Sequence, residues 1–163
     1  MNSTNEEIAK EIVGNSLYLT LASFDEIPWV SPLFFAVTPR YEFVFISSTT
    51  SRHARAIRAH SAVSWCVFLA SEAPESTDGV YFEGIAREIR PQDEHVQFYA
   101  DVLYDRRFPD AAERAAHPAN PAYWEETGRR LYVLTPTVAS KVDKEDPAGV
   151  SRADVDLAAM IEG

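Results

Sequence analysis

Residues 17–48 read LYLTLASFDEIPWVSPLFFAVTPRYEFVFISS. Apolar and polar side chains alternate from Leu17 to Phe24, a pattern typical of a half-buried strand. We expect two more strands, at Trp29–Val37 and Tyr41–Ser48, each after a tight turn that contains proline. Parallel neighbours need crossover connections of about a dozen residues or more. Turns this short therefore predict an antiparallel sheet.

Strands of similar length are expected downstream. Ala62–Ala70 and Gly79–Ile89 have strand patterns, and Gly84 is the expected site of a β-bulge. Pro136 is expected to break the last apolar stretch into two strands, 131–135 and 138–142. Short strands joined by turns predict a mainly β (α+β) fold, in which an antiparallel sheet closes into a barrel with helices at its periphery.

Capping residues and prolines predict the helices. The segment Ser3-Thr4-Asn5-Glu6 is typical of a helix start, and Ser51 is expected to begin a short helix that reaches Arg58. A last helix is expected at 152–161. Proline at a first helical position loses no hydrogen bond, so further helices are expected to open at Pro91, Pro109 and Pro121.

Length and charge limit the function. The 163 residues suit one domain, expected at 1–143, with a tail at 144–163 that packs on the barrel or on a partner subunit. The formal net charge of −10 repels nucleic-acid backbones and anionic membranes. Neither a membrane helix nor a signal peptide is evident, and the single cysteine, Cys66, allows no internal disulfide. We expect a soluble, cytoplasmic protein.

Basic residues are concentrated where the helix after Ser51 should start. The run SSTTSRHARAIR at 47–58 places Arg52, His53, Arg55 and Arg58 behind a row of hydroxyls. A helix start ordinarily prefers acidic residues. Free N–H groups, hydroxyls and cations aimed at one point make an anion site, typically for phosphate. A plain N-cap with solvated arginines explains the same residues, and the charge pattern leaves both interpretations open.

The strand WVSPLFF at 29–35 is a candidate wall for a flat ring. Such a site needs an apolar surface and exposed backbone groups. Pro32 cannot donate to a ladder, so its strand lies at a sheet edge or carries a bulge there. A core strand with one bulge is the alternative interpretation. The loop at 47–51 has no glycine, which argues against a P-loop and against a Rossmann phosphate loop.

The order of these features resembles the pyridoxamine 5′-phosphate oxidase-like family of FMN-binding split barrels. The resemblance covers about residues 6–89 and the strand at 131–136. It is strongest at 47–58, where the family has a hydroxyl, a short gap, then Ser-Arg-His or Ser-Arg-Lys and a helix. The other segments match by pattern more than by identity.

The resemblance implies a split β-barrel, a homodimer with FMN between the subunits, and flavin-dependent oxidoreductase activity on a small molecule. It places the phosphate and ribityl chain at the hydroxyl-rich loop and helix start, and the ring along the strand at 29–31. At Gly79, where some members place a polar contact, only backbone is present. The implied cofactor-binding residues are Trp29, Val30, Ser31, Ser47, Ser48, Ser51, Arg52, His53 and Gly79.

The chain also departs from the family. The substrate-binding Arg-x-His of the oxidases proper is missing near the C-terminus, because no histidine follows His117. Vitamin B6 oxidase activity is therefore not assigned, and the C-terminal heme ligand of heme-degrading relatives is absent too. No side chain stands out as a catalytic acid or base, and the histidines have no metal-site spacing. Two alternatives stay open: a flavin carrier or sensor without turnover, and a reductase that uses deazaflavin.

Overall fold

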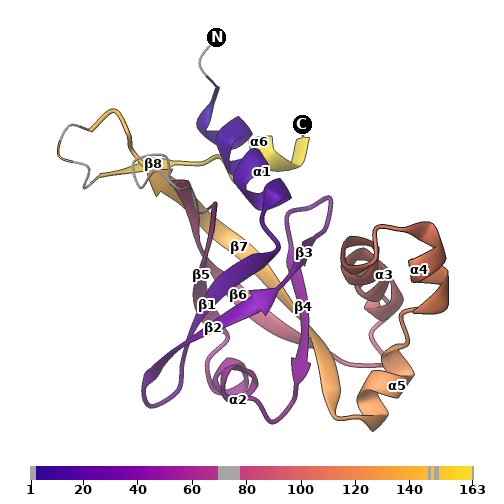
Figure 1. The fold of residues 1–163 in the computed structure, drawn as a ribbon. Helices are drawn as coiled ribbons and strands as arrows, with labels where there is room; N and C mark the ends of the chain where they lie inside the picture. The colour runs from indigo at the N-terminus through magenta and orange to yellow at the C-terminus, as the bar shows by residue number, and fades with distance from the viewer. Residues whose placement is uncertain (1–2, 70–77, 147, 149–150, 163) are drawn as a thin grey trace.

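The computed structural model describes residues 3–69, 78–146, 148 and 151–162. Its centre is one antiparallel sheet in the order β2-β1-β5-β6-β7-β4-β3, with β8 paired to β7 (Figure 1). The predicted fold class, a mainly β antiparallel barrel with peripheral helices, is confirmed. The strands are β1 Tyr18–Phe24, β2 Pro28–Phe34, β3 Ala36–Val37, β4 Phe43–Ser48, β5 Ala62–Leu69, β6 Asp78–Ile89, β7 Arg129–Val142 and β8 Arg152–Asp154.

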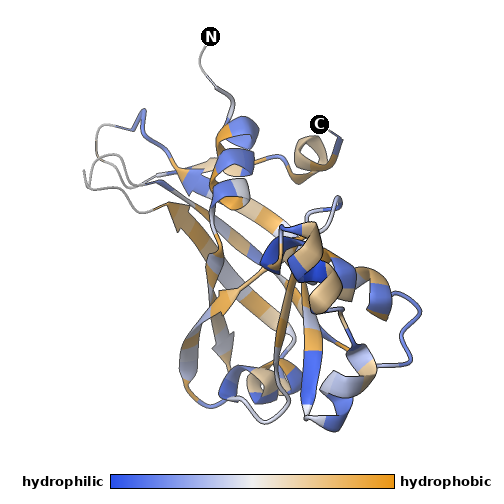
Figure 2. Cartoon of the chain, turned by 45° about the vertical axis from the view of Figure 1, so that its right-hand side comes forward, coloured by the Kyte–Doolittle hydropathy of each residue, from blue (hydrophilic) through white to orange (hydrophobic). Residues whose placement is uncertain are grey.

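Aromatic side chains fill the interior of the barrel. The Phe82 ring lies 4.9 Å from Phe43 and is stacked on Trp65 at 5.3 Å, measured between ring centroids. Phe45 is stacked on Tyr132 at 5.1 Å, which joins β4 to β7. The hydrophobic residues are concentrated in these strands (Figure 2). Close packing of this kind makes the barrel a rigid support for the loops at its ends.

Helices cover both ends of the barrel. Helices α1 (Asn5–Asn15) and α6 (Leu157–Glu162) lie at one end, and α2 (Arg52–Ala59) lies at the other (Figure 1). Thr4 and Glu7 form the capping box of α1, one residue later than the sequence predicted. Val155 and Met160 are buried in the main core, so the C-terminal residues pack on the barrel.

Three helices form a separate layer on one side of the sheet (Figure 1). They are α3 (Val96–Arg107), α4 (Ala111–Ala116) and α5 (Pro121–Glu126). A second apolar cluster, which includes Leu103, Trp124, Leu131 and Val133, fills the space between them and the outer face of β4 and β7. Arg106 donates to the carbonyl oxygens of Gly14 and Ser16, which ties α3 to the end of α1.

The barrel is open between β2 and β4. β2 is an edge strand, which is one of the two alternatives that Pro32 predicted, and Pro32 lies opposite Thr20 of β1. At the other end of the strand order, β3 pairs with β4. Helix α2 packs against β1, β2 and β6 at this open end. The structure thus places the two candidate segments of the sequence, 29–31 and 47–53, on either side of one opening.

One proline-based prediction about the strands was wrong. The last strand is not broken at Pro136: β7 is continuous, and its register shifts opposite Glu83 and Gly84, which leaves Thr137 as the extra residue. The bulge predicted at Gly84 is therefore present, with its additional residue on the neighbouring strand. Thr137 donates its hydroxyl to the Glu83 carbonyl at 3.2 Å, which helps to satisfy the ladder beside a proline that has no N–H.

Side-chain caps explain the other differences. Helix α3 begins at Val96 rather than at Pro91, because the Asp93 carboxylate accepts the His95 N–H at 3.0 Å and holds residues 91–95 in turns. The helix expected at 152–161 is instead β8 followed by α6, whose first N–H groups bond to Asp156. Residues 70–77, which include most of the segment between the strands predicted at 62–70 and 79–89, lie outside the described residues. In the described part of the chain, no helix is long and apolar enough to span a membrane.

Candidate functional site

Helix α2 starts at a capped but cationic N-terminus. Ser51 is the N-cap, and its hydroxyl accepts the Ala54 N–H at 3.3 Å. No acidic residue lies in the first turn. The N–H groups of Arg52 and His53 precede Ala54 and have no partner within the helix, as in any first helical turn. They point out of the helix start, where the macrodipole favours an anion.

His53 lies between β2 and β4 and contacts both strands. It is only 8% exposed, and its two ring nitrogens lie within hydrogen-bond distance of two serine hydroxyls. The Nε2 atom lies 2.7 Å from Ser47 Oγ on β4, and the Nδ1 atom lies 3.1 Å from Ser31 Oγ on β2. A neutral imidazole donates from one nitrogen and accepts at the other, and each hydroxyl can complement either role. His53 therefore links β2 to β4 through two hydrogen bonds and does not act as a free cation.

Burial lowers the pKa of the His53 imidazole below its ordinary value of 6.5. The unfolded chain then binds a proton at a pH where the folded protein does not, so unfolding becomes easier as the pH falls through about 6.5. We expect the free energy of unfolding, measured by urea titration from about pH 8 to about pH 5.5, to decline across this window.

The His53→Gln variant should lose most of that decline, and His95→Gln, which changes an exposed histidine, should retain it. A wild-type curve that is flat from about pH 7.5 to 5.5 would contradict a neutral, buried His53.

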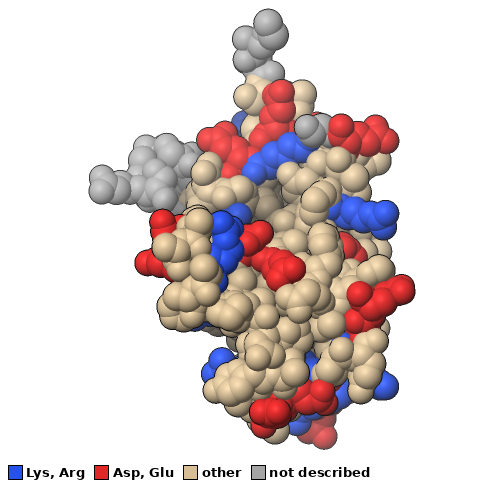
Figure 3. Space-filling model, turned by 90° about the vertical axis from the view of Figure 1, so that its right-hand side faces the viewer, with Lys and Arg blue, Asp and Glu red and all other residues tan. Residues whose placement is uncertain are grey.

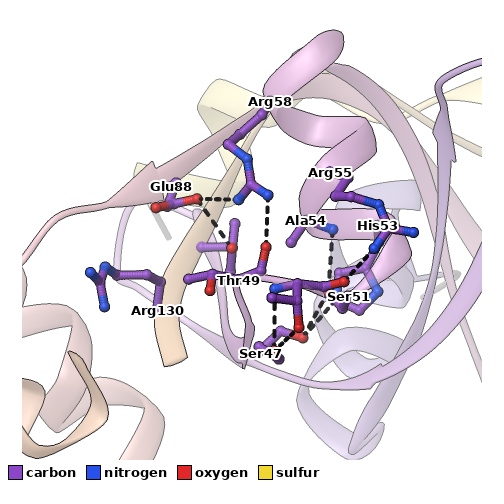
Figure 4. Close-up of polar contacts among 12 residues, drawn as sticks. Ser47, Thr49, Ser51, His53, Ala54, Arg55, Arg58, Glu88 and Arg130 are labelled. Atoms are coloured by element: carbon purple, nitrogen blue, oxygen red, sulfur yellow. Dashed lines mark hydrogen bonds and ion pairs between the residues drawn. The ribbon is translucent and has the colours of Figure 1, made fainter. Parts of the chain in front are cut away.

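The two later arginines of α2 serve the loop that precedes the helix. Arg55 donates to the Thr50 carbonyl. Arg58 donates to the Thr49 carbonyl at 2.7 Å and forms an ion pair with Glu88 at 3.1 Å (Figure 4). Glu88 also accepts the hydroxyl of the buried Tyr132, and burial beside this carboxylate raises the pKa of Tyr132. These cations neutralise backbone dipoles and a carboxylate, so they stabilise the loop.

Gly128 also stabilises this loop, and the sequence patterns did not identify it. The Gly128 carbonyl accepts both the N–H of Thr49, at 2.9 Å, and its hydroxyl, at 3.1 Å. Gly128 has a φ of +69°, which glycine adopts without strain. The Thr-Gly pair before Arg129 is a turn signal that could have marked this position. The contact links the loop at 48–51 to the start of β7.

Arg52 differs from Arg55 and Arg58, because its guanidinium lies over an aromatic ring of β2 and not at the loop carbonyls. Its side chain is exposed, and its guanidinium carbon lies 4.2 Å from the centroid of the Trp29 ring on β2. Trp29 and Val30 are themselves exposed, at 40% and 59%. Arg52 therefore connects the start of α2 to the face of β2 that Trp29 shares with Ser31. A cation, first-turn N–H groups and an apolar strand surface adjoin in one place.

The remaining candidate residues do not all lie at the start of α2. Ser47 and Ser51 are adjacent, with their hydroxyl oxygens 3.4 Å apart, whereas Ser48 is exposed and contacts the Thr50 hydroxyl at 2.9 Å. Gly79 pairs with Phe68 near the far end of β5. Since β5 begins beside α2 and rises roughly 3.3 Å per residue, Gly79 lies about 20 Å away from the helix. In this chain, Gly79 does not lie with the other site residues.

Comparisons with known proteins support the fold. The chain matches a heme-binding protein from Mycobacterium smegmatis with a TM-score of 0.73 at 16% identity, over 99% of this chain and 62% of that one. It matches a protein of Listeria innocua named as a pyridoxamine 5′-phosphate oxidase (0.61, 13%, over 85% and 98%). It also matches an FAD-binding protein from Mesorhizobium loti (0.57, 16%, over 82% and 91%).

The chain has a split-barrel fold. Identities of 13–16% establish shared architecture and no more. No family model matches the sequence, and no curated protein matches it. The chain spans 62% of the length of the M. smegmatis protein. The split-barrel neighbours differ in the cofactor for which they are named, so the choice of cofactor depends on the residues of this chain.

Proposed function

We propose that this protein is a flavin-binding oxidoreductase that uses FMN, acts on a small molecule in the cytoplasm, and works as a homodimer. The observation that carries the proposal is the meeting of Arg52, the first-turn N–H groups of α2 and the exposed edge of β2 at one opening of the barrel. Bound there, the flavin would supply hydride or electron transfer. The proposal names no catalytic acid or base among the side chains.

The donor set fits a phosphate group. Arg52 offers a planar array of N–H donors, and the start of α2 adds backbone donors and a favourable dipole. The Ser48 hydroxyl is exposed at the same loop. Trp29 provides an apolar surface next to this anchor, which suits a flat aromatic ring. His53 contributes structure rather than charge, since it is neutral and bonded to two serines.

The experiment is a visible absorption spectrum of the purified protein, followed by titration with FMN, with a deazaflavin and with hemin. We expect FMN to bind more tightly than the other two. A colourless protein that ignores FMN would overturn the proposal. Reduction of the FMN complex by NADH or NADPH, with reoxidation by an acceptor, distinguishes an oxidoreductase from a carrier or sensor without turnover.

An exposed apolar face supports the homodimer. The registers of β1, β5, β6 and β7 place a set of small and apolar side chains on the outside of the barrel. Phe68, Tyr81, Ile85 and Val138 are 50%, 37%, 46% and 48% exposed. Contiguous apolar patches of this kind mark protein interfaces. The outward residues are Thr20, Ala22, Ala62, Ser64, Cys66, Phe68, Tyr81, Glu83, Ile85 and Val138.

We expect the wild-type protein to have the mass of two chains in size-exclusion chromatography with light scattering. Ile85→Glu should shift it to the mass of one chain, because a carboxylate would be buried at the interface without a partner. Phe98→Glu is the matched control: Phe98 is 48% exposed, but it lies on α3. A dimer that persists in Ile85→Glu would place the interface on another face.

A further inference from the structure

A cavity lies between the helical layer and the outer face of the barrel. Its volume is about 450 Å³, and residues of α3, α5, β4 and β7 line it. Tyr104 is central to its wall: the Tyr104 ring centroid lies 5.2 Å from that of Trp124 and 5.6 Å from that of Phe108. Small-molecule sites commonly have roughly 300–1,000 Å³ and aromatic walls. The cavity has the size and lining for one aromatic ring system.

Arg129 brings a cation to this cavity from the sheet. Leu131 and Val133 are buried in the apolar cluster under the helices. Alternate residues of a strand share a face, so Arg129 belongs to the same row as these two side chains. It lies opposite Ser48 of β4, where the apolar layer ends. The strand thus places a guanidinium at the margin of a face that is otherwise apolar.

Arg107 reaches the same cavity from α3. Its guanidinium carbon lies 6.0 Å from the Phe34 ring and 5.8 Å from the Phe108 ring. Among the described residues, the ion pairs involve neither Arg107 nor Arg129, whereas the nearby Arg130 is paired with Glu125 at 2.8 Å. The described residues that line the cavity include no acidic side chain, although 25 of the 163 residues are acidic. Two cations without carboxylate partners therefore meet at one aromatic pocket.

The surface around the cavity suits a small anion rather than a polymer. On the face that carries α3, α4 and α5, acidic and basic side chains are interspersed (Figure 3). A polyanion would need a broad basic surface. A cavity with aromatic walls and two arginines instead matches a compact ligand that has one flat apolar part and one anionic group.

We propose that this cavity binds a small planar aromatic carboxylate, with its ring against Tyr104 and Trp124 and its carboxylate between Arg107 and Arg129. Arginine pairs with carboxylates through two parallel hydrogen bonds, which fixes their orientation. The proposal does not depend on the flavin. None of the residues that line the cavity belongs to the site at Trp29, Ser31, Ser47 and Arg52.

The test uses the full chain without added cofactor and 2-naphthoate as the probe. Binding is followed by calorimetry and by the tryptophan fluorescence of the protein, because Trp124, one of its three tryptophans, lines the cavity. We expect 2-naphthoate to bind at least about tenfold more tightly than the neutral 2-naphthylmethanol. Arg107→Gln and Arg129→Gln should each weaken 2-naphthoate by about tenfold or more and leave the alcohol unchanged.

Arg114→Gln is the matched control, because Arg114 lies on α4, is paired with Asp105 and does not line the cavity. It should bind 2-naphthoate as the wild type does. The proposal would be overturned if the acid and the alcohol bound with equal affinity, or if all three variants had equal affinity for 2-naphthoate. It would also be overturned if neither 2-naphthoate nor benzoate bound. FMN titration of the same variants separates this outcome from a failure of the flavin proposal, since FMN affinity should be unchanged in each.

Discussion

Replacing Arg52 by alanine is expected to weaken FMN binding by about 1.5–3 kcal/mol, a loss of roughly tenfold to 150-fold in affinity. The structure gives the reason. Arg55 and Arg58 donate to loop carbonyls, and His53 is held between two serines. Arg52 lies instead over the exposed Trp29 ring, where its N–H groups can meet a phosphate. The dissociation constant for FMN, measured by fluorescence quenching, is the quantity to compare.

Arg40→Ala serves as the control, because it removes an exposed arginine from the turn before β4 and away from α2. It should leave FMN affinity unchanged, although it removes one positive charge just as Arg52→Ala does. Arg52→Lys should give an intermediate affinity, since lysine retains the charge and loses the planar pair of donors. An unchanged dissociation constant in Arg52→Ala would mean that the phosphate is held elsewhere.

The largest effect on stability is expected at Gly84. A Cβ atom there would lie 2.1 Å from the carbonyl oxygen of Thr135 and 3.0 Å from the Cα atom of Pro136. Both are backbone atoms of the neighbouring strand at the bulge, so no flexible side chain can move aside. Overpacking commonly costs about 1–3 kcal/mol, and a clash with ladder backbone should reach the upper end or exceed it. We expect Gly84→Ala to lower the free energy of unfolding by about 3 kcal/mol or more.

Gly14→Ala is the matched control for this substitution. Nothing lies within 4 Å of the position of its added Cβ, and Gly14 is within helix α1. Alanine there should stabilise the protein by up to about 1 kcal/mol, because glycine loses more backbone entropy in a helix. Urea unfolding measures both variants. If Gly84→Ala and the wild type had the same midpoint, the β7 bulge would have to shift without cost.

Local patterns predicted most of the strands and helices. The alternation at Leu17–Phe24, the turns around Pro28 and Pro39, and the N-cap at Ser51 all depend on residues a few positions apart. The errors at Pro91 and Pro136 have a different origin. Asp93 delays α3 through a side-chain bond to the His95 N–H, and Thr137 supports the bulge through its hydroxyl. The predictions at the two prolines considered only the N–H group that proline lacks. They did not consider hydrogen bonds from nearby side chains, which decided the outcome at both places.

The sequence by itself determined the fold class, the helix start at Ser51 and the concentration of cations behind it, because each depends on neighbouring residues. Only the tertiary structure decided which of those cations bond to the loop and which one lies over Trp29. The partner of His53 on β2 lies 22 positions away, and the Glu88 partner of Arg58 lies 30 positions away. Such contacts form when the barrel brings β2, β4 and β6 together. They hold His53 between two serines, bond Arg58 to the loop, and leave Arg52 over Trp29.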